Sequence, residues 1–175
     1  MIRTIFAGRL AALVFALSGC ATNPPLPVRP STEAIVAFSF SGRIAVRQGE
    51  TRHHAKLDWH HDSASDEILV TTPLGQGVAE ITRDASGAHL LLADRRRFSA
   101  ADWGELSQEV FGFRLPLQTS TRWLLGNVVE IEGWRIRVIE RESIAPDALP
   151  TVIELEGERD DITVRLKIDE WGEVR

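Results

Sequence analysis

Hydrophobic and polar residues alternate along most of the chain that follows residue 37. In the first such segment, Phe38, Phe40 and Ile44 fall on one side, whereas Ser41 and Arg43 fall on the other. A period of two is typical of a β-strand with one buried face. The same alternation predicts further strands over residues 53–60, 67–72, 78–83, 88–93, 134–140, 151–156 and 162–169.

One segment has helical spacing instead. Trp103, Leu106 and Val110 recur at intervals of three and four residues, which is typical of an amphipathic helix. Residues 99–102 (Ser-Ala-Ala-Asp) fit a capping box at the start of this helix. Gly112 is placed to end it, because glycine is the common residue just after a helix C-terminus.

A second helix is predicted from about residue 117 to 125. Pro116 suits its first turn and Gly126 suits its C-terminus. Residues 31–34 give a weaker signal for a short helix. Helices placed between two runs of strands indicate an α+β fold, with an antiparallel sheet and helices on one of its faces.

The first twenty residues have the pattern of a processing signal. Arg3 and Arg9 accompany an uncharged apolar run over residues 10–17, and Leu-Ser-Gly-Cys follows. The apolar run is too short to span a bilayer, which takes about 20 residues. The sequence around Cys20 resembles the bacterial lipobox, in which the signal is removed before the cysteine and the cysteine is lipidated. We therefore expect a secreted lipoprotein anchored through Cys20.

The next ten residues predict a tether. Residues 21–30 hold four prolines, and such a segment forms a semi-rigid spacer rather than helix or sheet. The chain is thus expected to consist of a signal peptide (1–19), a lipidated cysteine with its tether (20–30) and a single domain (31–175). Ala21 rather than Asp after the cysteine favours sorting to the outer membrane.

Composition and charge exclude several classes of function. The chain has 175 residues, of which 43% are hydrophobic and 26% charged, as in an average globular domain. Its net charge of −5 argues against a general nucleic-acid binder. A single cysteine cannot form an internal disulfide and excludes a multi-cysteine metal site.

No residue pattern indicates a catalytic site, a metal site or a cofactor site. Four histidines cluster at 53, 54, 60 and 61, but His54 and His60 are about 20 Å apart along one strand face and cannot chelate one ion. We therefore expect these histidines on the solvent face and at strand ends. Residues 95–97, three arginines, are expected to form a solvated turn before the helix cap. No serine has the Gly-x-Ser-x-Gly context of a nucleophile elbow.

A short turn is predicted between two strands. Pro73 and Gly75 occupy positions that suit a type I turn, with Leu74 at its tip. An apolar residue at a hairpin tip is usually incidental. In a protein held near a bilayer, the same leucine could touch lipid.

Several short motifs, taken together in order and spacing, resemble the LolB family of outer-membrane lipoproteins over the length from the lipobox to the C-terminus. They are Phe-Ser-Gly-Arg-Ile-Ala-Val at 40–46, Leu-Asp-Trp at 57–59, Pro-Leu-Gly at 73–75, Phe-Gly-Phe-Arg-Leu-Pro-Leu at 111–117, Trp-Leu-Leu-Gly at 123–126, Gly-Trp at 133–134 and Trp171. The resemblance has two departures: the stretch between Gly126 and Gly133 is shorter than usual, and Val138 stands where the family has an aromatic residue after Gly-Trp. They leave one or two strands on that side in question.

This resemblance implies a fold and a function. The fold is an incomplete antiparallel β-barrel of about nine or more strands, with helices lidding a hydrophobic cavity. Such a protein lies on the periplasmic face of the outer membrane of a Gram-negative bacterium. It accepts lipoproteins from the periplasmic carrier LolA by binding their acyl chains, and it inserts them into the membrane. The resemblance assigns membrane insertion to the Pro73–Gly75 loop, with Leu74 protruding, and we expect a monomer without a cofactor.

The residues expected to form the acyl-chain cavity come from the apolar faces of the predicted elements. They are Phe38, Phe40, Ile44, Leu57, Trp59, Trp103, Trp123 and Trp134. Two other functions stay open at this point. A structural or assembly lipoprotein would bind a protein partner through its sheet edge and have a solid core. A periplasmic hydrolase would need a polar cleft with a carboxyl group of raised pKa.

Overall fold

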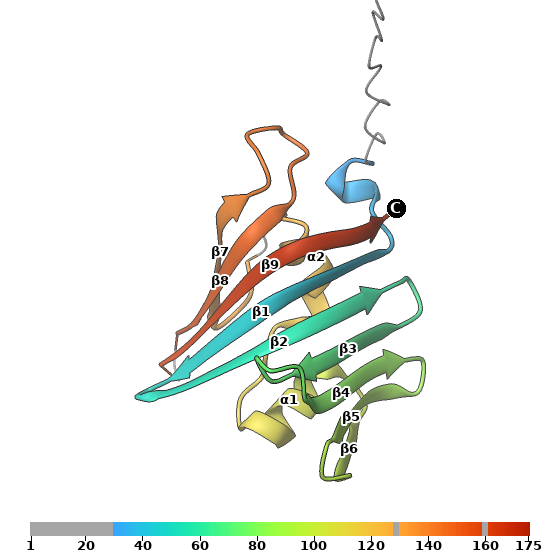
Figure 1. The fold of residues 1–175 in the computed structure, drawn as a ribbon, viewed down its shortest axis with the longest axis vertical. Helices are drawn as coiled ribbons and strands as arrows, with labels where there is room; N and C mark the ends of the chain where they lie inside the picture. Colours follow the sequence, from blue (N-terminus) through green and yellow to red (C-terminus); the bar gives the residue numbers. More distant parts are fainter. Residues whose placement is uncertain (1–29, 128–129, 159–160) are drawn as a thin grey trace, which may run out of the picture.

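A single antiparallel sheet of nine strands dominates the molecule (Figure 1). The computed structural model describes residues 30–127, 130–158 and 161–175; the predicted signal peptide, Cys20 and nearly all of the predicted tether lie outside these ranges. The strand order is β6-β5-β4-β3-β2-β1-β9-β8-β7. The strands are β1 (Phe38–Gln48), β2 (Thr51–His61), β3 (Asp66–Thr71), β4 (Gly77–Asp84), β5 (Gly87–Leu92), β6 (Arg97–Ala100), β7 (Trp134–Arg141), β8 (Pro150–Gly157) and β9 (Ile162–Val174).

The first and last strands lie side by side in the middle of the sheet. β1 pairs with β2 on one side and with β9 on the other. Gly42 lies at a register shift between β1 and β9, where an added Cβ would come 2.5 Å from the backbone oxygen of Lys167. A glycine is therefore needed at this position for the two strands to approach so closely.

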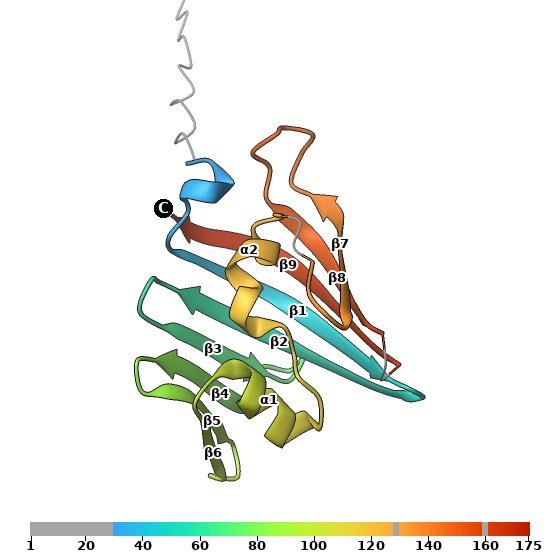
Figure 2. The ribbon, with the colours of Figure 1, turned by 180° about the vertical axis from the view of Figure 1, so that it is seen from behind.

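The sheet curves around the helices but does not close. The helices lie on its concave face, seen from behind in Figure 2, and β6 and β7 form its two edges. The expectation of an incomplete antiparallel barrel with about nine strands is thus confirmed at the level of the sheet. The alternation in the sequence matches the two faces of the sheet. Over much of β9 and β2, a residue that faces the helices is followed by one that is more exposed on the outer face.

Helix α1 (Trp103–Phe111) follows directly after β6. Its N-cap is Asp102, whose side chain accepts a hydrogen bond from the Glu105 backbone N–H (2.9 Å), while the Glu105 side chain accepts one from Ala101 N–H (3.3 Å). The predicted capping box at residues 99–102 is wrong by three positions, because residues 97–100 pair with β5. Residues 95–97 were expected to form a solvated turn; Arg97 is exposed, but it belongs to β6 and not to a turn.

The second predicted helix is shorter and begins as a 3-10 turn. Its parts are η2 (Leu117–Thr119) and α2 (Ser120–Leu124), and a further 3-10 turn, η1 (Thr32–Ala34), precedes β1. At one end of this helical region, α1 packs on β5 and β6. At its other end, the Arg141 side chain of β7 donates a hydrogen bond to the Gly126 carbonyl (3.2 Å). The helical region therefore spans the open side of the sheet between its two edges.

Candidate functional site

The apolar interior between the sheet and the helices contains the residues that the sequence singled out. Strands β1 and β2 contribute Phe38, Phe40, Leu57 and Trp59, all of them buried. The helices contribute two more buried side chains. The last two candidates, Ile44 and Trp134, are half-buried at the margin of the same cluster. The two buried helical residues are Trp103 and Trp123. All eight candidates thus lie in or against one continuous apolar cluster.

Aromatic rings are concentrated where β1, β2 and β9 run together. The Phe40 ring lies 5.8 Å from Trp59 and 5.2 Å from Trp171, measured between ring centroids. Phe38 lies 5.8 Å from Trp171 with an edge-to-face angle of 80°. These distances are those of favourable aromatic pairs. Trp171 was not among the candidate cavity residues, although it completes this group.

Three of the candidate and neighbouring indoles are fixed by hydrogen bonds to backbone oxygens. Trp123 Nε1 donates to the Pro116 carbonyl (3.0 Å), and Trp134 Nε1 donates to the Arg114 carbonyl (3.0 Å). Trp171 Nε1 donates to the Pro150 carbonyl (2.9 Å). A buried indole N–H usually finds such a partner. The rings are therefore held in place and present apolar surfaces to the interior.

Trp59 donates instead to a buried carboxylate, Asp66, which the sequence analysis missed. Asp66 accepts hydrogen bonds from Trp59 Nε1 (2.9 Å), His61 Nδ1 (2.7 Å) and Arg83 Nε (2.5 Å). Burial raises the pKa of the Asp66 carboxyl, but these three hydrogen bonds outweigh it and hold the pKa below its usual value. The burial of Asp66 could have been predicted from the sequence, because Asp66 lies two residues before Ile68 and so falls on the same, buried face of the strand.

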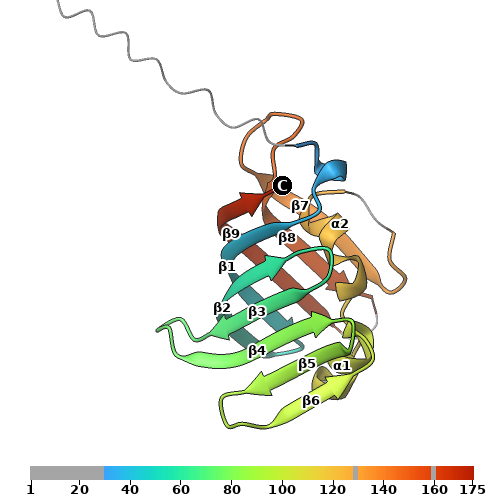
Figure 3. The same ribbon diagram turned by 90° about the vertical axis from the view of Figure 1, so that its right-hand side faces the viewer.

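The Pro-Leu-Gly loop forms a tight turn between β3 and β4. Gly75 N–H donates to the Thr72 carbonyl and Thr72 N–H donates to the Gln76 carbonyl, both at 2.8 Å. Gly75 has a φ of +86°, as expected for the residue that follows a type I turn in a three-residue hairpin loop. Leu74 lies at the tip with 91% of its surface exposed. In Figure 3 this turn projects from the side of the sheet that faces away from the helices.

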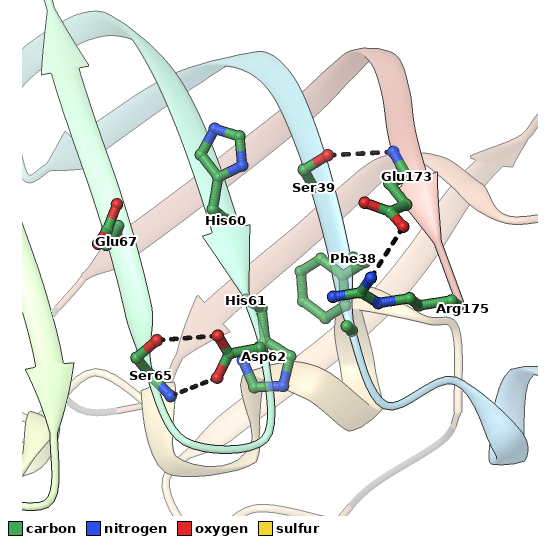
Figure 4. A pocket seen from close by; sticks show the side chains of 10 residues that line it. Phe38, Ser39, His60, His61, Asp62, Ser65, Glu67, Glu173 and Arg175 are labelled. Atoms are coloured by element: carbon green, nitrogen blue, oxygen red, sulfur yellow. Dashed lines mark hydrogen bonds and ion pairs between the residues drawn. The ribbon is translucent and has the colours of Figure 1, made fainter.

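A polar pocket of about 290 Å³ lies at the end of the sheet where β1 begins and β2 ends (Figure 4). Asp62 accepts hydrogen bonds from Ser65 N–H and Oγ, and the Arg175 side chain donates to Glu173 (3.0 Å). Hydrogen bonds from the Ala64 and Ser65 backbones lower the pKa of Asp62. A hydrolytic site would instead need a carboxyl group of raised pKa.

The histidines do not converge. His53, His54 and His60 are exposed, as expected, whereas His61 is half-buried against Asp66 and stacks on Phe38 with ring centroids 4.8 Å apart. Within the described ranges, no three histidine, cysteine or acidic side chains lie close enough together to hold a metal ion. In the same ranges, no helix is long and apolar enough to cross a membrane.

Comparison with known proteins decides the family. Residues 36–132 match the family described as "Outer membrane lipoprotein LolB". The chain belongs to the LolB family. Relatives named "Outer-membrane lipoprotein LolB" support this over nearly the full length: the protein of Chromobacterium violaceum is 32% identical, covering 98% of this chain and 99% of its own. The protein of an Azoarcus strain is 32% identical, covering 95% of each chain.

Membership of the LolB family makes this protein an outer-membrane lipoprotein of a Gram-negative bacterium that acts in lipoprotein localisation. The family is one of lipoprotein trafficking and not of enzymes, so the hydrolase alternative is set aside. Among solved structures, a LolA superfamily protein from Nitrosomonas europaea superposes with a TM-score of 0.43 at 7% identity, covering 78% of this chain and 85% of its own.

Proposed function

We propose that this protein accepts lipoproteins from the periplasmic carrier LolA by taking up their acyl chains between its sheet and its helices, and then inserts them into the outer membrane. The observation that carries the proposal is the continuous apolar cluster on the concave face of an unclosed sheet. A sheet without closure can part from its covering helices without breaking its own strand pairing.

The chemistry of this interior suits an acyl chain. Most of its described lining is aliphatic and aromatic, and each methylene group that moves from water into such surroundings contributes about 0.8 kcal/mol. The indole N–H groups of Trp59, Trp123 and Trp134 already have partners, so these rings offer apolar contact without an unsatisfied donor. Transfer between carrier, receptor and bilayer then needs no catalytic residue, because small differences in apolar fit set the direction.

Entry requires the helical region to move. Where it crosses to β7, two hydrogen bonds hold it: Trp134 Nε1 to the Arg114 carbonyl and Arg141 Nη2 to the Gly126 carbonyl. Breaking both, and withdrawing the buried side chains of Trp123, Leu124 and Leu125 from the core, would free the segment that carries α2. The helices then act as the lid over the acyl-chain site: Trp103 and Trp123 line it from the lid, and the six candidate residues of the strands line it from the sheet.

Insertion is assigned to the Pro73–Gly75 turn. This turn projects from the outer face of the sheet, and Leu74 at its tip is so exposed that it contributes nothing to the core. A leucine exposed on a rigid turn can enter the apolar boundary of a bilayer at little conformational cost. The anchor is assigned to Cys20, the signal peptide to residues 1–19, the tether to residues 20–30 and the receptor domain to residues 31–175, which we propose acts as a monomer.

The test is a transfer experiment with purified components. The mature chain, starting at residue 20 and carrying Cys20→Ala, is mixed with a complex of the carrier and an acylated lipoprotein. We expect the lipoprotein to move to the receptor and to copurify with it. The matched control is the same lipoprotein without acyl chains, which should stay behind. Equal transfer of both forms, or transfer of neither, would contradict the proposal.

A further inference from the structure

The lysines of this chain have an unusual distribution. Of its 20 basic residues only two are lysines, Lys56 and Lys167, and they are 111 positions apart in the sequence. The fold brings both onto the exposed outer face of the sheet, one on each side of the same residue. Arg43 of β1 is paired with Lys56 of β2 and with Lys167 of β9. The three side chains form a single row across the strands, which we call the lysine row.

The lysine row ends at the membrane-insertion turn. Lys56 is paired with Thr71, the last residue of β3, and Pro73 follows two residues later. A shallow groove of about 240 Å³ runs here over the outer face. Its walls include all three residues of the row together with His54, Pro73 and Arg165.

The two lysines are the charges of this groove that have no ion-pair partner among the described residues, although the Asp169 carboxylate also interacts electrostatically with both. Asp169 neutralises Arg43 through a two-pronged interaction, with Arg43 Nε and Nη2 at 2.8 and 2.5 Å from its two carboxylate oxygens. Arg165 lies 3.7 Å from Glu154. Among the described residues, neither Lys56 nor Lys167 has an acidic partner within ion-pair distance, and both are exposed. The groove therefore carries a local positive charge in a chain whose net charge is −5.

We propose that the lysine row binds the phosphate of a phospholipid headgroup in the bilayer that Leu74 enters. This inference rests on the proposed role of the Pro73–Gly75 turn. An interfacial apolar group lies about 5–10 Å into the boundary between headgroups and acyl chains. Basic side chains beside it then reach the headgroup level, where their stems cover apolar surface and their ammonium groups meet phosphate.

A lipid surface fits this groove better than an acidic protein does. The lining of the groove also contains apolar residues, Ala45 and Pro73 among them, and the groove adjoins a leucine that is almost fully exposed. An apolar tip flanked by cations is the pattern of an interfacial membrane contact. Two flexible ammonium groups also suit a mobile headgroup, because lysine acts as a point charge rather than a planar fork.

The first experiment measures binding to vesicles. The mature Cys20→Ala chain is floated with vesicles of phosphatidylethanolamine and phosphatidylglycerol. The lysine-row variant is Lys56→Gln with Lys167→Gln. The matched control is Arg97→Gln with Arg122→Gln, which removes the same charge from exposed positions on β6 and α2. Since each basic residue near an anionic surface is worth about a fivefold change in affinity, we expect the lysine-row variant to bind roughly tenfold or more weakly and the control to bind nearly as the parent does.

The second experiment uses the scarcity of lysine. An amine-reactive reagent can modify only Lys56, Lys167 and the chain's α-amino group in the mature chain. Mass spectrometry then gives the labelling of each site with and without vesicles. We expect both lysines to be protected by vesicles that contain phosphatidylglycerol, less so at high salt, with the α-amino group as the internal reference.

The outcomes separate this inference from the proposed function. Unchanged vesicle binding of the lysine-row variant, or unprotected lysines, would overturn the phosphate site. A variant that binds vesicles normally but fails to receive cargo from the carrier would also overturn it and assign the row to a protein partner. Acceptance of cargo by the parent chain is measured separately, so a failure of the acyl-chain proposal would be seen in that assay instead.

Discussion

Leu74 is a large apolar side chain that contacts almost nothing. Its turn is closed by two backbone hydrogen bonds, and its surface is 91% exposed. The sequence predicted both the turn and its tip, because proline and glycine at fixed positions determine the backbone locally. A position that is exposed and independent of the core is one where a substitution can change function without changing stability.

We expect Leu74→Glu to change the free energy of unfolding by no more than about 0.5 kcal/mol, as at ordinary surface positions. Acceptance of cargo from the carrier should be retained, and delivery into liposomes should fall, because a carboxylate would have to enter the apolar boundary of the bilayer. The measurement has two steps, carrier to receptor and receptor to liposome. The control is Leu74→Ala, which would lose about 2–5 kcal/mol if the leucine were buried. Full delivery by Leu74→Glu, or loss of acceptance, would refute the assigned role.

Asp66 is the opposite kind of residue, since it is 3% exposed and accepts three hydrogen bonds. Its pKa is lowered in the folded protein, whereas an unfolded aspartate has a pKa of about 3.9. The ionised carboxylate therefore stabilises the fold above pH about 4, and this contribution is lost as the pH falls through the lower folded pKa.

We expect Asp66→Asn to lower the free energy of unfolding at pH 7 by about 2 kcal/mol, because the amide cannot accept from Trp59, His61 and Arg83 as the carboxylate does. The difference from the parent should shrink as the pH falls from 4 toward 2. Urea denaturation across this range measures it, with Asp147→Asn, an exposed carboxyl between β7 and β8, as control. A difference that stays constant with pH would contradict the linkage to ionisation.

At the level of elements, the sequence predicted the long strands well and the region around residue 100 badly. Alternation is a local signal, and β2 and β9 have it over many residues. β6 has only four residues, too few for periodicity to distinguish a strand from a turn. The capping box predicted at residues 99–102 puts the N-cap at Ser99, whereas the structure has it at Asp102, so these two residues are the competing positions for the helix start. Pairing of β6 with β5 decides between them, and such pairing depends on residues distant from the cap.

This competition gives a prediction for α1. Asp102→Ala should cost about 1 kcal/mol, the usual loss for an N-cap, because Asp102 accepts hydrogen bonds from Glu105 N–H and from Gln118 Nε2 (3.1 Å). Ser99→Ala should cost no more than about 0.5 kcal/mol, since Ser99 is exposed and its hydroxyl is hydrogen-bonded to the half-buried His89 rather than to a helix N–H group. Chemical denaturation of both variants measures the two values. A larger loss for Ser99→Ala than for Asp102→Ala would place the cap at Ser99.

At the scale of the whole molecule, the strand order could not be derived from the alternation pattern. β1 and β9 are neighbours although more than a hundred residues separate them, and alternation says which face a residue lies on but not which strand lies beside it. The composition of the apolar interior depends on the strand order. Trp171 contacts Phe38 and Phe40 because β9 lies beside β1. The eight candidate residues meet because each lies on an apolar face, which the sequence does reveal.

The lipid anchor and the Leu74 turn must be able to reach the same bilayer. The described chain enters the sheet at the start of β1, while the Leu74 turn projects from the outer face. Eleven residues from Cys20 to Pro30 can span at most about 40 Å, comparable with the roughly 37 Å of an eleven-residue strand. The predicted tether is therefore long enough for the lipid anchor and Leu74 to meet the same bilayer.

We expect Cys20→Ala to separate anchoring from folding. The variant should leave the membrane fraction, because no acyl chains remain to hold it, and its melting temperature should match that of an enzymatically deacylated parent domain, because the proline-rich tether is predicted to form no part of the core. Cell fractionation, incorporation of labelled fatty acid and thermal denaturation measure these effects, with the unsubstituted chain labelled in parallel. Labelled fatty acid on the variant would show that Cys20 is not the lipidated residue. A large drop in melting temperature would show that the N-terminal segment supports the domain, and Leu74 would then have to reach the bilayer without a free tether.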